Sequence, residues 1–399
     1  MKPLLLILVW LSFAAQSWAQ LAIKGETIYT MSGPPLKNGV VLIKDGKVEA
    51  VGTNIAVPSG YRILSAKVVT PGLVDAHSVV GLSGILNYNH DQDQLELSEA
   101  IQPELRAEDA YNAEERLVKW LRDYGVTTVH TGHGPGALAS GQTMVVKTDA
   151  NTAPSAIVKT PAMVAFTLGA SVSQNYKKPG TRAKGAAMLR EEFIKAQDYA
   201  QKMRSKDPTK RPARDLRMEI LNEVLTGKLP ALFTVHRATE IITALRLQKE
   251  FGFKLILDGA AEAYLVIDEI KKAGVPVILH PPMIRTVGES ENASFETAAK
   301  LRRAGIKIAL QSGYESYVPK TRVVLFEAAI AAANGLSFEE ALRAITIDAA
   351  EILGVANRVG SIEKGKDADL VLFDGDPFEY TTHVCQVIIN GRVVKETCN

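Results

Sequence analysis

The chain has 399 residues, of which 46% are hydrophobic and 23% are charged. This composition is typical of a globular protein and excludes a disordered, collagen-like or disulfide-framework chain. Lys and Arg number 46 against 44 Asp and Glu, so no charge pattern favours nucleic acid or anionic lipid. We therefore expect the partner to be a small-molecule substrate or ligand, or another protein.

Residues 1–19 have the pattern of a secretory signal peptide. Lys2 precedes an apolar run from Leu4 to Ala15, and the small residues Ser17 and Ala19 predict cleavage after Ala19. This run is shorter than the roughly 20 residues that a membrane span needs, although an uncleaved segment of this kind can act as an anchor. We expect a mature protein that is periplasmic or secreted and is not held in the membrane.

The two ends of the mature chain, residues 20–67 and 356–399, both predict short strands joined by tight turns. In each end an Asp-Gly or Asn-Gly dipeptide, at Asp45-Gly46 and at Asn390-Gly391, separates two β-branched runs and predicts a hairpin. Two or three isolated strands are only marginally stable in water. We therefore expect both ends to pair into one small β-sandwich domain.

Only two cysteines are present, and they flank the second predicted hairpin. In a regular register Cys385 lies opposite Glu396, which makes Cys398 a diagonal neighbour roughly 7 to 8 Å away. Disulfide Cα separations rarely exceed about 6.8 Å, but a twisted or bulged hairpin end would close the gap, and an oxidising compartment favours the bond. A structural disulfide and two unpaired thiols both remain open.

Between these ends, residues 68–355 alternate apolar strand-like runs with amphipathic helical stretches. Eight such runs predict a (β/α)₈ TIM-like barrel, with a doubly wound open sheet as the alternative. Two insertions, the acidic segment 87–109 and the partly basic segment 171–212, would follow strands on the face that carries chemistry in such barrels. A solvated surface position is the simpler interpretation of both. The eight runs are 68–76, 126–130, 143–147, 163–168, 232–236, 254–257, 275–279 and 306–310.

The segment Val69-Thr-Pro-Gly-Leu-Val-Asp-Ala-His77 resembles the first barrel strand of the amidohydrolase superfamily, and residues 335–354 and 360–371 resemble its C-terminal part. The likeness extends over nearly all of the mature chain and is greatest to imidazolonepropionase-like amidohydrolases. It implies a metal-dependent hydrolase that acts on a cyclic amide or another C–N bond. One or two divalent ions, with zinc the first choice, would activate water at the C-terminal mouth of the barrel.

The resemblance implies His77 and His236 as metal ligands, but three further ligand positions are substituted. Val79 replaces the second imidazole of the usual His-x-His, Gly259 stands where the sixth strand supplies a His, and Gly313 stands where the eighth strand supplies an Asp. A catalytic zinc site needs about three protein ligands and an open water position. Two imidazoles alone are too few for tight binding.

Replacement ligands or catalytic groups would come from Asp258, His280 or Lys147. Asp258 would serve as the base for water if its side chain points inward, and strand alternation allows only one of Asp258 and Gly259 to do so. Lys147 would bridge metals only after carbamylation, as in some family members. Other candidates, for which a structural or solvated role is the simpler interpretation, are His90, Asp91, Asp93, His130 and His133.

Two functional hypotheses follow from the substituted ligand set. The first is an exported, metal-dependent amidohydrolase with a rebuilt site. The second is a catalytically inactive amidohydrolase-fold protein that binds a small ligand or partner without a metal. The fold does not decide between them, because function depends on the site; a measurement of bound metal does.

Overall fold

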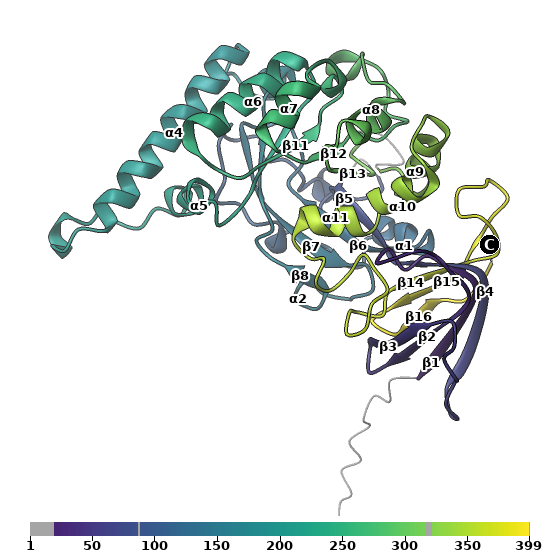
Figure 1. Ribbon diagram of the computed structural model, residues 1–399. Helices are drawn as coiled ribbons and strands as arrows, with labels where there is room; N and C mark the ends of the chain where they lie inside the picture. Colours follow the sequence, from purple (N-terminus) through teal and green to yellow (C-terminus); the bar gives the residue numbers. More distant parts are fainter. Residues whose placement is uncertain (1–19, 87, 316–320, 399) are drawn as a thin grey trace, which may run out of the picture.

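The computed structural model describes residues 20–86, 88–315 and 321–398 (Figure 1). The predicted signal peptide, residues 1–19, lies outside the described residues. The described chain forms a barrel with helices on its outside and, next to it, a sheet made from both chain ends, seen in Figure 1 as neighbouring purple and yellow strands. Within the part of the chain that is described, no helix is both long and apolar enough to cross a bilayer.

Both chain ends contribute to one seven-stranded sheet, in the order β16-β15-β14-β4-β1-β2-β3. The two ends meet where β4 pairs antiparallel with β14, with Val69 opposite Leu372. These two side chains and Ile23 of β1 share one buried core. The prediction that the ends form a common β domain is therefore confirmed. The strands are β1 (Leu21–Ile28), β2 (Leu36–Lys44), β3 (Lys47–Gly52), β4 (Arg62–Pro71), β14 (Leu370–Phe373), β15 (Val384–Ile389) and β16 (Arg392–Lys395).

Gly72 is the point at which the chain passes from this sheet into the barrel. The predicted strand 68–76 is in fact two strands, because β4 ends at Pro71 and the first barrel strand, β5, spans Leu73–Ser78. A Cβ atom at Gly72 would lie only 2.1 Å from Oγ1 of Thr127. The close approach of β6 therefore requires glycine at this position, and at this first crossing a single residue joins the sheet to the barrel.

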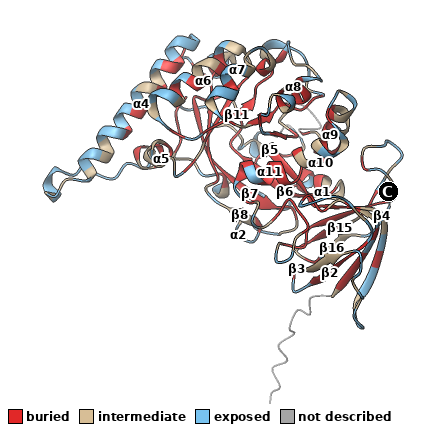
Figure 2. Cartoon of the chain, in the orientation of Figure 1, coloured by how far each residue is buried: buried red, intermediate tan, exposed pale blue. Residues whose placement is uncertain are grey.

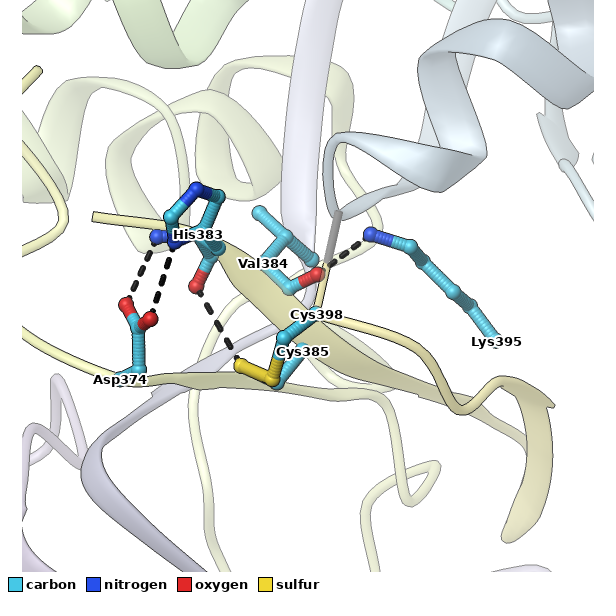
Figure 3. Close-up of a disulfide and its surroundings, with 6 residues drawn as sticks. All are labelled: Asp374, His383, Val384, Cys385, Lys395 and Cys398. Carbon is cyan, nitrogen blue, oxygen red and sulfur yellow. Dashed lines mark hydrogen bonds and ion pairs between the residues drawn. A yellow bond between two sulfur atoms is a disulfide. The ribbon is translucent and has the colours of Figure 1, made fainter. Parts of the chain in front are cut away.

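Cys385 and Cys398 form a disulfide, which Figure 3 shows beside β15. The hairpin turns at Asn390-Gly391, and a bulge in β16 pairs Val387 with Lys395. This extra residue moves Cys398 one place closer to Cys385 than a regular register allows. The Cα atoms consequently lie 3.9 Å apart, and of the two open alternatives the structure shows the bonded one.

Eight strands form the nearly closed barrel, in the order β5-β6-β7-β9-β10-β11-β12-β13, and each contains residues from one of the eight predicted runs. The two edge strands meet through a parallel bridge between Ser78 and Gly313. Val74, Leu232 and Ile278 belong to the apolar cluster that fills the barrel interior. The remaining strands are β6 (Val126–Gly132), β7 (Ala139–Lys147), β9 (Val164–Thr167), β10 (Ala231–Val235), β11 (Leu255–Gly259), β12 (Val277–Leu279) and β13 (Ile308–Leu310), with the short β8 (Ile157–Lys159) paired to β7 outside this order.

Strand β7 departs from the expected repeat, because it runs antiparallel to both β6 and β9. No helix lies between Gly132, the last residue of β6, and Ala139, the first residue of β7. A parallel crossover needs a dozen or more residues, roughly twice what is available here. The reversal places Lys147, the last residue of β7, opposite Thr128 near the start of β6, at the end of the barrel away from the mouth.

The helices pack mainly on the outside of the barrel. Helix α4 buries Leu189 and Phe193, and Figure 2 shows its far end exposed where it runs out into solvent. The solvated surface position predicted for residues 171–212 therefore holds only in part, since one face of α4 is buried. The helices are α1 (Arg116–Asp123), α2 (Ala153–Ala156), α3 (Ala170–Asn175), α4 (Arg182–Met203), α5 (Leu216–Leu225), α6 (Ala238–Phe251), α7 (Ile267–Ala273), α8 (Thr297–Arg303), α9 (Val324–Ala333), α10 (Phe338–Ala344) and α11 (Ile347–Leu353).

Helix α9 carries a buried carboxyl group, Glu327, whose Oε2 accepts a hydrogen bond of 2.8 Å from the main-chain N–H of Met283. Burial raises the pKa of Glu327 to about 7, although the Met283 hydrogen bond and the charge of Arg322 act in the opposite direction. The folded protein therefore binds this proton more tightly than the unfolded chain. The resulting stabilisation is complete below the unfolded pKa near 4.5 and is lost as the pH rises through 7.

We expect Glu327→Gln to match the wild type in stability near pH 4.5 and to exceed it at pH 8. Gln keeps an acceptor for Met283 and does not ionise, so the difference in unfolding free energy should approach about 3 kcal/mol. Urea unfolding at the two pH values measures it. The control is Glu339→Gln at an exposed position, and an equal change at both pH values in Glu327→Gln would contradict the prediction.

Candidate functional site

A cavity of about 80 Å³ lies at the C-terminal mouth of the barrel, where TIM-barrel enzymes carry their catalytic groups. It is lined by His77 of β5, His236 after β10, Asp258 of β11, His280 after β12 and Gln311 after β13. Four of the five residues that the sequence assigned to the site are therefore brought together. The fifth, Lys147, is elsewhere.

Asp258 points into the barrel and binds side chains from β5, from β10 and from the residue that follows β13. Its Oδ1 atom accepts hydrogen bonds from Nδ1 of His77 at 2.9 Å and Nε2 of Gln311 at 2.8 Å. Its Oδ2 atom accepts from Oγ1 of Thr234 at 2.6 Å. Burial acts to raise the pKa of Asp258, but the charge of His77 and these hydrogen bonds outweigh it and lower the pKa. Asp258 is thus an ionised group that orients His77.

His77 is fixed by Asp258 through Nδ1, which leaves Nε2 for another partner. Burial acts to lower the pKa of His77, but the charge of Asp258 and this hydrogen bond outweigh it and raise the pKa. This Nε2 atom is buried and has no hydrogen-bond partner among the described residues. The main-chain N–H of His77 donates to Oδ1 of Asp75 at 3.3 Å, and the same oxygen accepts from the main chain of Ser312 at 2.9 Å. Asp75 thereby joins β5 to the end of β13 directly beside His77.

His236 and His280 face the same cavity. Nδ1 of His280 donates to the carbonyl oxygen of Pro281 at 2.8 Å, so that Nε2 carries the lone pair. Nε2 of His280 and Nδ1 of His236 are both buried without a partner among the described residues. Burial lowers the pKa of both imidazoles, that of His280 to about 4, which keeps them neutral. Together with His77, three unpartnered ring nitrogens line one cavity.

The three substituted ligand positions are packed in ways that suit the present residues. A Cβ atom at Gly259, which has a φ of +75°, would lie 2.7 Å from Cε1 of His236, so the ring of His236 fills that space. A Cβ atom at Gly313 would lie 3.0 Å from Cγ of Pro281. Val79 is buried in the cavity wall. A histidine at position 259 would therefore displace His236.

Lys147 is not a site residue, contrary to the sequence-based assignment. Its Nζ atom is buried in an ion pair with Asp369 and lies 3.2 Å from Oδ2 of Asp367, in the segment that leads into β14. The reversal of β7 is the physical reason, because it carries the end of the strand away from the mouth. Carbamylation would also replace the positive charge that these two carboxylates require.

The other histidines predicted as weaker candidates do not join this cavity. His130 is buried beside His77 and is fully satisfied, with Nδ1 bonded to the carbonyl of Ala76 and Nε2 to Oγ1 of Thr143, both at 2.7 Å. Burial lowers its pKa to about 3, which is consistent with the structural role considered for it. His90 lies at the surface, 3.8 Å from Asp91. His133 lines a different cavity.

Two groups in the cavity wall were not identified from the sequence. Thr234 lies two residues before His236, and strand alternation places both side chains on the same face. This spacing could have identified Thr234 from the sequence. Glu315 lies two residues beyond Gly313, lines the cavity, and is paired with Nη2 of Arg322 at 2.5 Å. A carboxylate is therefore kept near the end of the eighth strand, shifted along the chain by two positions.

A larger recess of about 500 Å³ adjoins the small cavity and shares Pro135, Thr234 and His236 with it. Its wall includes Arg182, whose Nε atom donates to Glu240 at 2.6 Å, and Glu289, which accepts from the main chain of Ala170 at 2.5 Å. The recess provides room for a small substrate next to the imidazoles.

The donor chemistry of the cavity fits a divalent cation such as zinc. Zinc prefers imidazole nitrogens, and a metal-bound His usually donates its other ring N–H to a carboxylate or carbonyl, as His77 and His280 do here. The three unpartnered nitrogens are the observation that supports this fit. They do not form a ready-made cage, since within residues 20–86, 88–315 and 321–398 no three His, Cys, Asp or Glu side chains already stand in a metal-holding arrangement.

Comparisons with known proteins agree with this architecture. The amidohydrolase family model matches residues 241–394. The imidazolonepropionase of Caldanaerobacter subterraneus subsp. tengcongensis is 26% identical over 91% of this chain and 90% of its own length. The amidohydrolase tasK of Hapsidospora irregularis is 24% identical, and the present chain spans only 39% of its length.

Solved structures extend the comparison. An amidohydrolase from Thermotoga maritima MSB8 is 33% identical, with a TM-score of 0.89 over 94% of this chain and all of that chain. An adenosine deaminase from Xanthomonas campestris with bound zinc is 18% identical, with a TM-score of 0.54 over 95% of this chain and 93% of that chain, and shows the fold alone. The chain belongs to the amidohydrolase superfamily, as an imidazolonepropionase-like member.

Proposed function

We propose that the protein is a metal-dependent hydrolase of a small cyclic amide or a related non-peptide C–N bond, with His77, His236 and His280 as the metal ligands. The supporting observation is the set of three buried, unpartnered imidazole nitrogens around one cavity. Leaving such an atom unsatisfied costs about 1–3 kcal/mol. A bound cation would satisfy all three at once and explain why the cavity retains them.

The protein's own residues would hold and orient the reacting groups. A divalent cation bound here supplies Lewis acidity, which stabilises negative charge on a reacting oxygen. Asp258 would hold Nδ1 of His77, so that Nε2, after losing its proton, is the ring nitrogen left for the cation, and Thr234 and Gln311 fix Asp258 in turn. The adjoining recess would hold the remainder of the substrate next to His236.

Glu315 is the carboxylate that we assign as proton acceptor for the attacking water. The oxygens of Asp258 already accept three hydrogen bonds, so Asp258 acts as a positioning residue. Glu315 lines the same cavity, in the segment after β13 where Gly313 replaces the family carboxylate. Its ion pair with Arg322 would hold it in place.

A second candidate function, binding of a small ligand without a metal, is supported by two observations. The described side chains do not form a ready-made metal cluster, and the position of the usual family Asp is Gly313. In that case the three imidazoles would bind hydrogen-bond donors of a ligand, and no hydrolysis would occur.

Metal analysis of tag-free protein tests the proposed function. We expect about one equivalent of zinc after dialysis, and at least a 10-fold loss of zinc affinity in His280→Ala or His236→Ala, since each removes one of three ligands. Hydrolysis of five- and six-membered cyclic amides and imides would be measured with the same samples. His90→Ala, at the surface, is the matched control and should bind zinc like the wild type.

Less than about one-tenth of an equivalent of metal, with unchanged stability in chelator, would reject the hydrolase and leave the binding function. Zinc binding that survives both His variants would reject the ligand assignment.

Export is part of the proposal as well. N-terminal sequencing of protein from the periplasm or medium should begin at Gln20, and an intact residue 1–19 segment would contradict cleavage.

A further inference from the structure

A second and larger cavity, of about 920 Å³, lies outside the barrel mouth. Its walls come from residues 92–109 of the acidic insertion and the adjoining Ala110, from α5, from His133 after β6 and from Gln142 of β7. It shares no lining residue with the cavity of the three imidazoles. Its volume is within the range of small-molecule binding sites, which is about 300–1,000 Å³.

The charges around this acidic cavity are strongly unbalanced. Seven lining side chains are carboxylates and one, Arg106, is a cation. Four of the seven pair with a Lys or Arg nearby. The other three, Asp93, Glu96 and Asp109, have no Lys, Arg or His within 4.0 Å among the residues that are described. The cavity therefore has an excess of three negative charges.

His133 adds an independent indication that the cavity has a ligand. Its side chain is 5% exposed and lines the cavity, and neither ring nitrogen has a described hydrogen-bond partner of ordinary geometry. The ring packs against Gly141, where a Cβ atom would lie 2.4 Å from Cδ2 of His133. Burial lowers its pKa to about 4, with the main chain of Asp93 acting in the opposite direction. A neutral imidazole thus offers an unused lone pair.

Glu104 provides a second unused acceptor. Its Oε1 atom lies 3.3 Å from Nη2 of Arg217, whereas its Oε2 atom is buried and has no partner within the described chain. Buried acceptors of this kind are normally paired. Between the acceptors the walls are apolar, with Leu95, Leu105 and Ile220. A matching ligand combines several N–H donors, positive charge and hydrocarbon segments.

We propose that this acidic cavity binds a linear aliphatic polyamine. Ammonium groups would pair with Asp93, Asp109 and Glu104, and the methylene segments would cover the apolar walls. A single metal ion would fill only a small part of the volume and would leave those apolar walls exposed. This site does not depend on the hydrolase function, because the two cavities have no lining residue in common.

Titration calorimetry of the full mature protein with spermidine tests the proposal. We expect one site, with spermidine bound at least 10-fold more tightly than butylamine, and weaker binding when NaCl is raised from 50 to 300 mM. The variant Glu104→Gln/Asp109→Asn should reduce the affinity at least 10-fold. The control Glu191→Gln/Asp268→Asn makes the same charge change at exposed positions on α4 and α7 and should bind normally.

His133→Leu should also reduce the affinity at least 10-fold. If this buried variant does not fold, the result for Glu104→Gln/Asp109→Asn decides. Equal losses in the two double variants, equal affinity for spermidine and Mg²⁺, or no saturable binding would each overturn the proposal. Spermidine binding by zinc-free protein and by His236→Ala should match the wild type. The polyamine site is then tested independently of whether the hydrolase function is correct.

Discussion

Lys147→Met should lower the free energy of unfolding by about 3–5 kcal/mol, the usual effect of removing one partner from a buried ion pair. Lys147 is 4% exposed and is the basic partner of Asp369, which is 5% exposed. Met preserves much of the side-chain volume, so the loss would come from the carboxylate left without its cation. Equilibrium unfolding in urea measures the change.

Lys47→Met is the matched control, because Lys47 pairs with Asp367 of the same cluster but its side chain is half exposed. Burial acts to raise the pKa of Asp367, but Lys147, Lys47 and Arg358 outweigh it and lower the pKa, so Asp367 keeps two cations when either Lys is lost. We expect the control to lose about 1 kcal/mol or less. An equal loss of unfolding free energy in both variants would show that the buried pair of Lys147 and Asp369 contributes no more to stability than the exposed Lys47.

Asp258→Asn should weaken zinc binding about 10- to 100-fold while the protein remains folded. The neutral amide presents an N–H to one of the donors that now bind Asp258, either Thr234 or Gln311. His77 would lose the charged acceptor that fixes its ring and tautomer. Zinc calorimetry gives the affinity, and NMR of the His77 ring reports the tautomer.

Asp348→Asn separates this effect from general destabilisation. Asp348 on α11 is also buried, and it binds Arg302 and Arg343 at 2.9 Å each, away from the cavity. We expect this variant to lose stability and keep its zinc affinity. Equal zinc affinity in Asp258→Asn and Asp348→Asn would show that Asp258 does not position a ligand.

Much of the fold could be predicted because it depends on local patterns. All eight apolar runs of the barrel became strands, and the Asn390-Gly391 dipeptide became the hairpin turn. The direction of β7 could not be predicted from its own residues, since a continuous apolar run is typical of parallel strands and also occurs in antiparallel ones. The absence of a helical pattern between Gly132 and Ala139 was the one available signal.

The candidate site was predicted in part. His77, His236 and His280 could be placed at strand ends, and the structure brings them to one cavity. The binding of Asp258 to His77 depends on side chains 181 positions apart in the chain, which no single-sequence pattern reports. The same holds for Lys147, whose partners lie 220 or more positions away.

The packing of His236 over Gly259 also bears on how this site could have evolved. With a left-handed backbone at 259 and an imidazole already in the space, Gly259→His would be harmful unless His236 changed as well. A histidine could therefore enter position 259 only together with a second substitution, so a single mutation cannot add a ligand there.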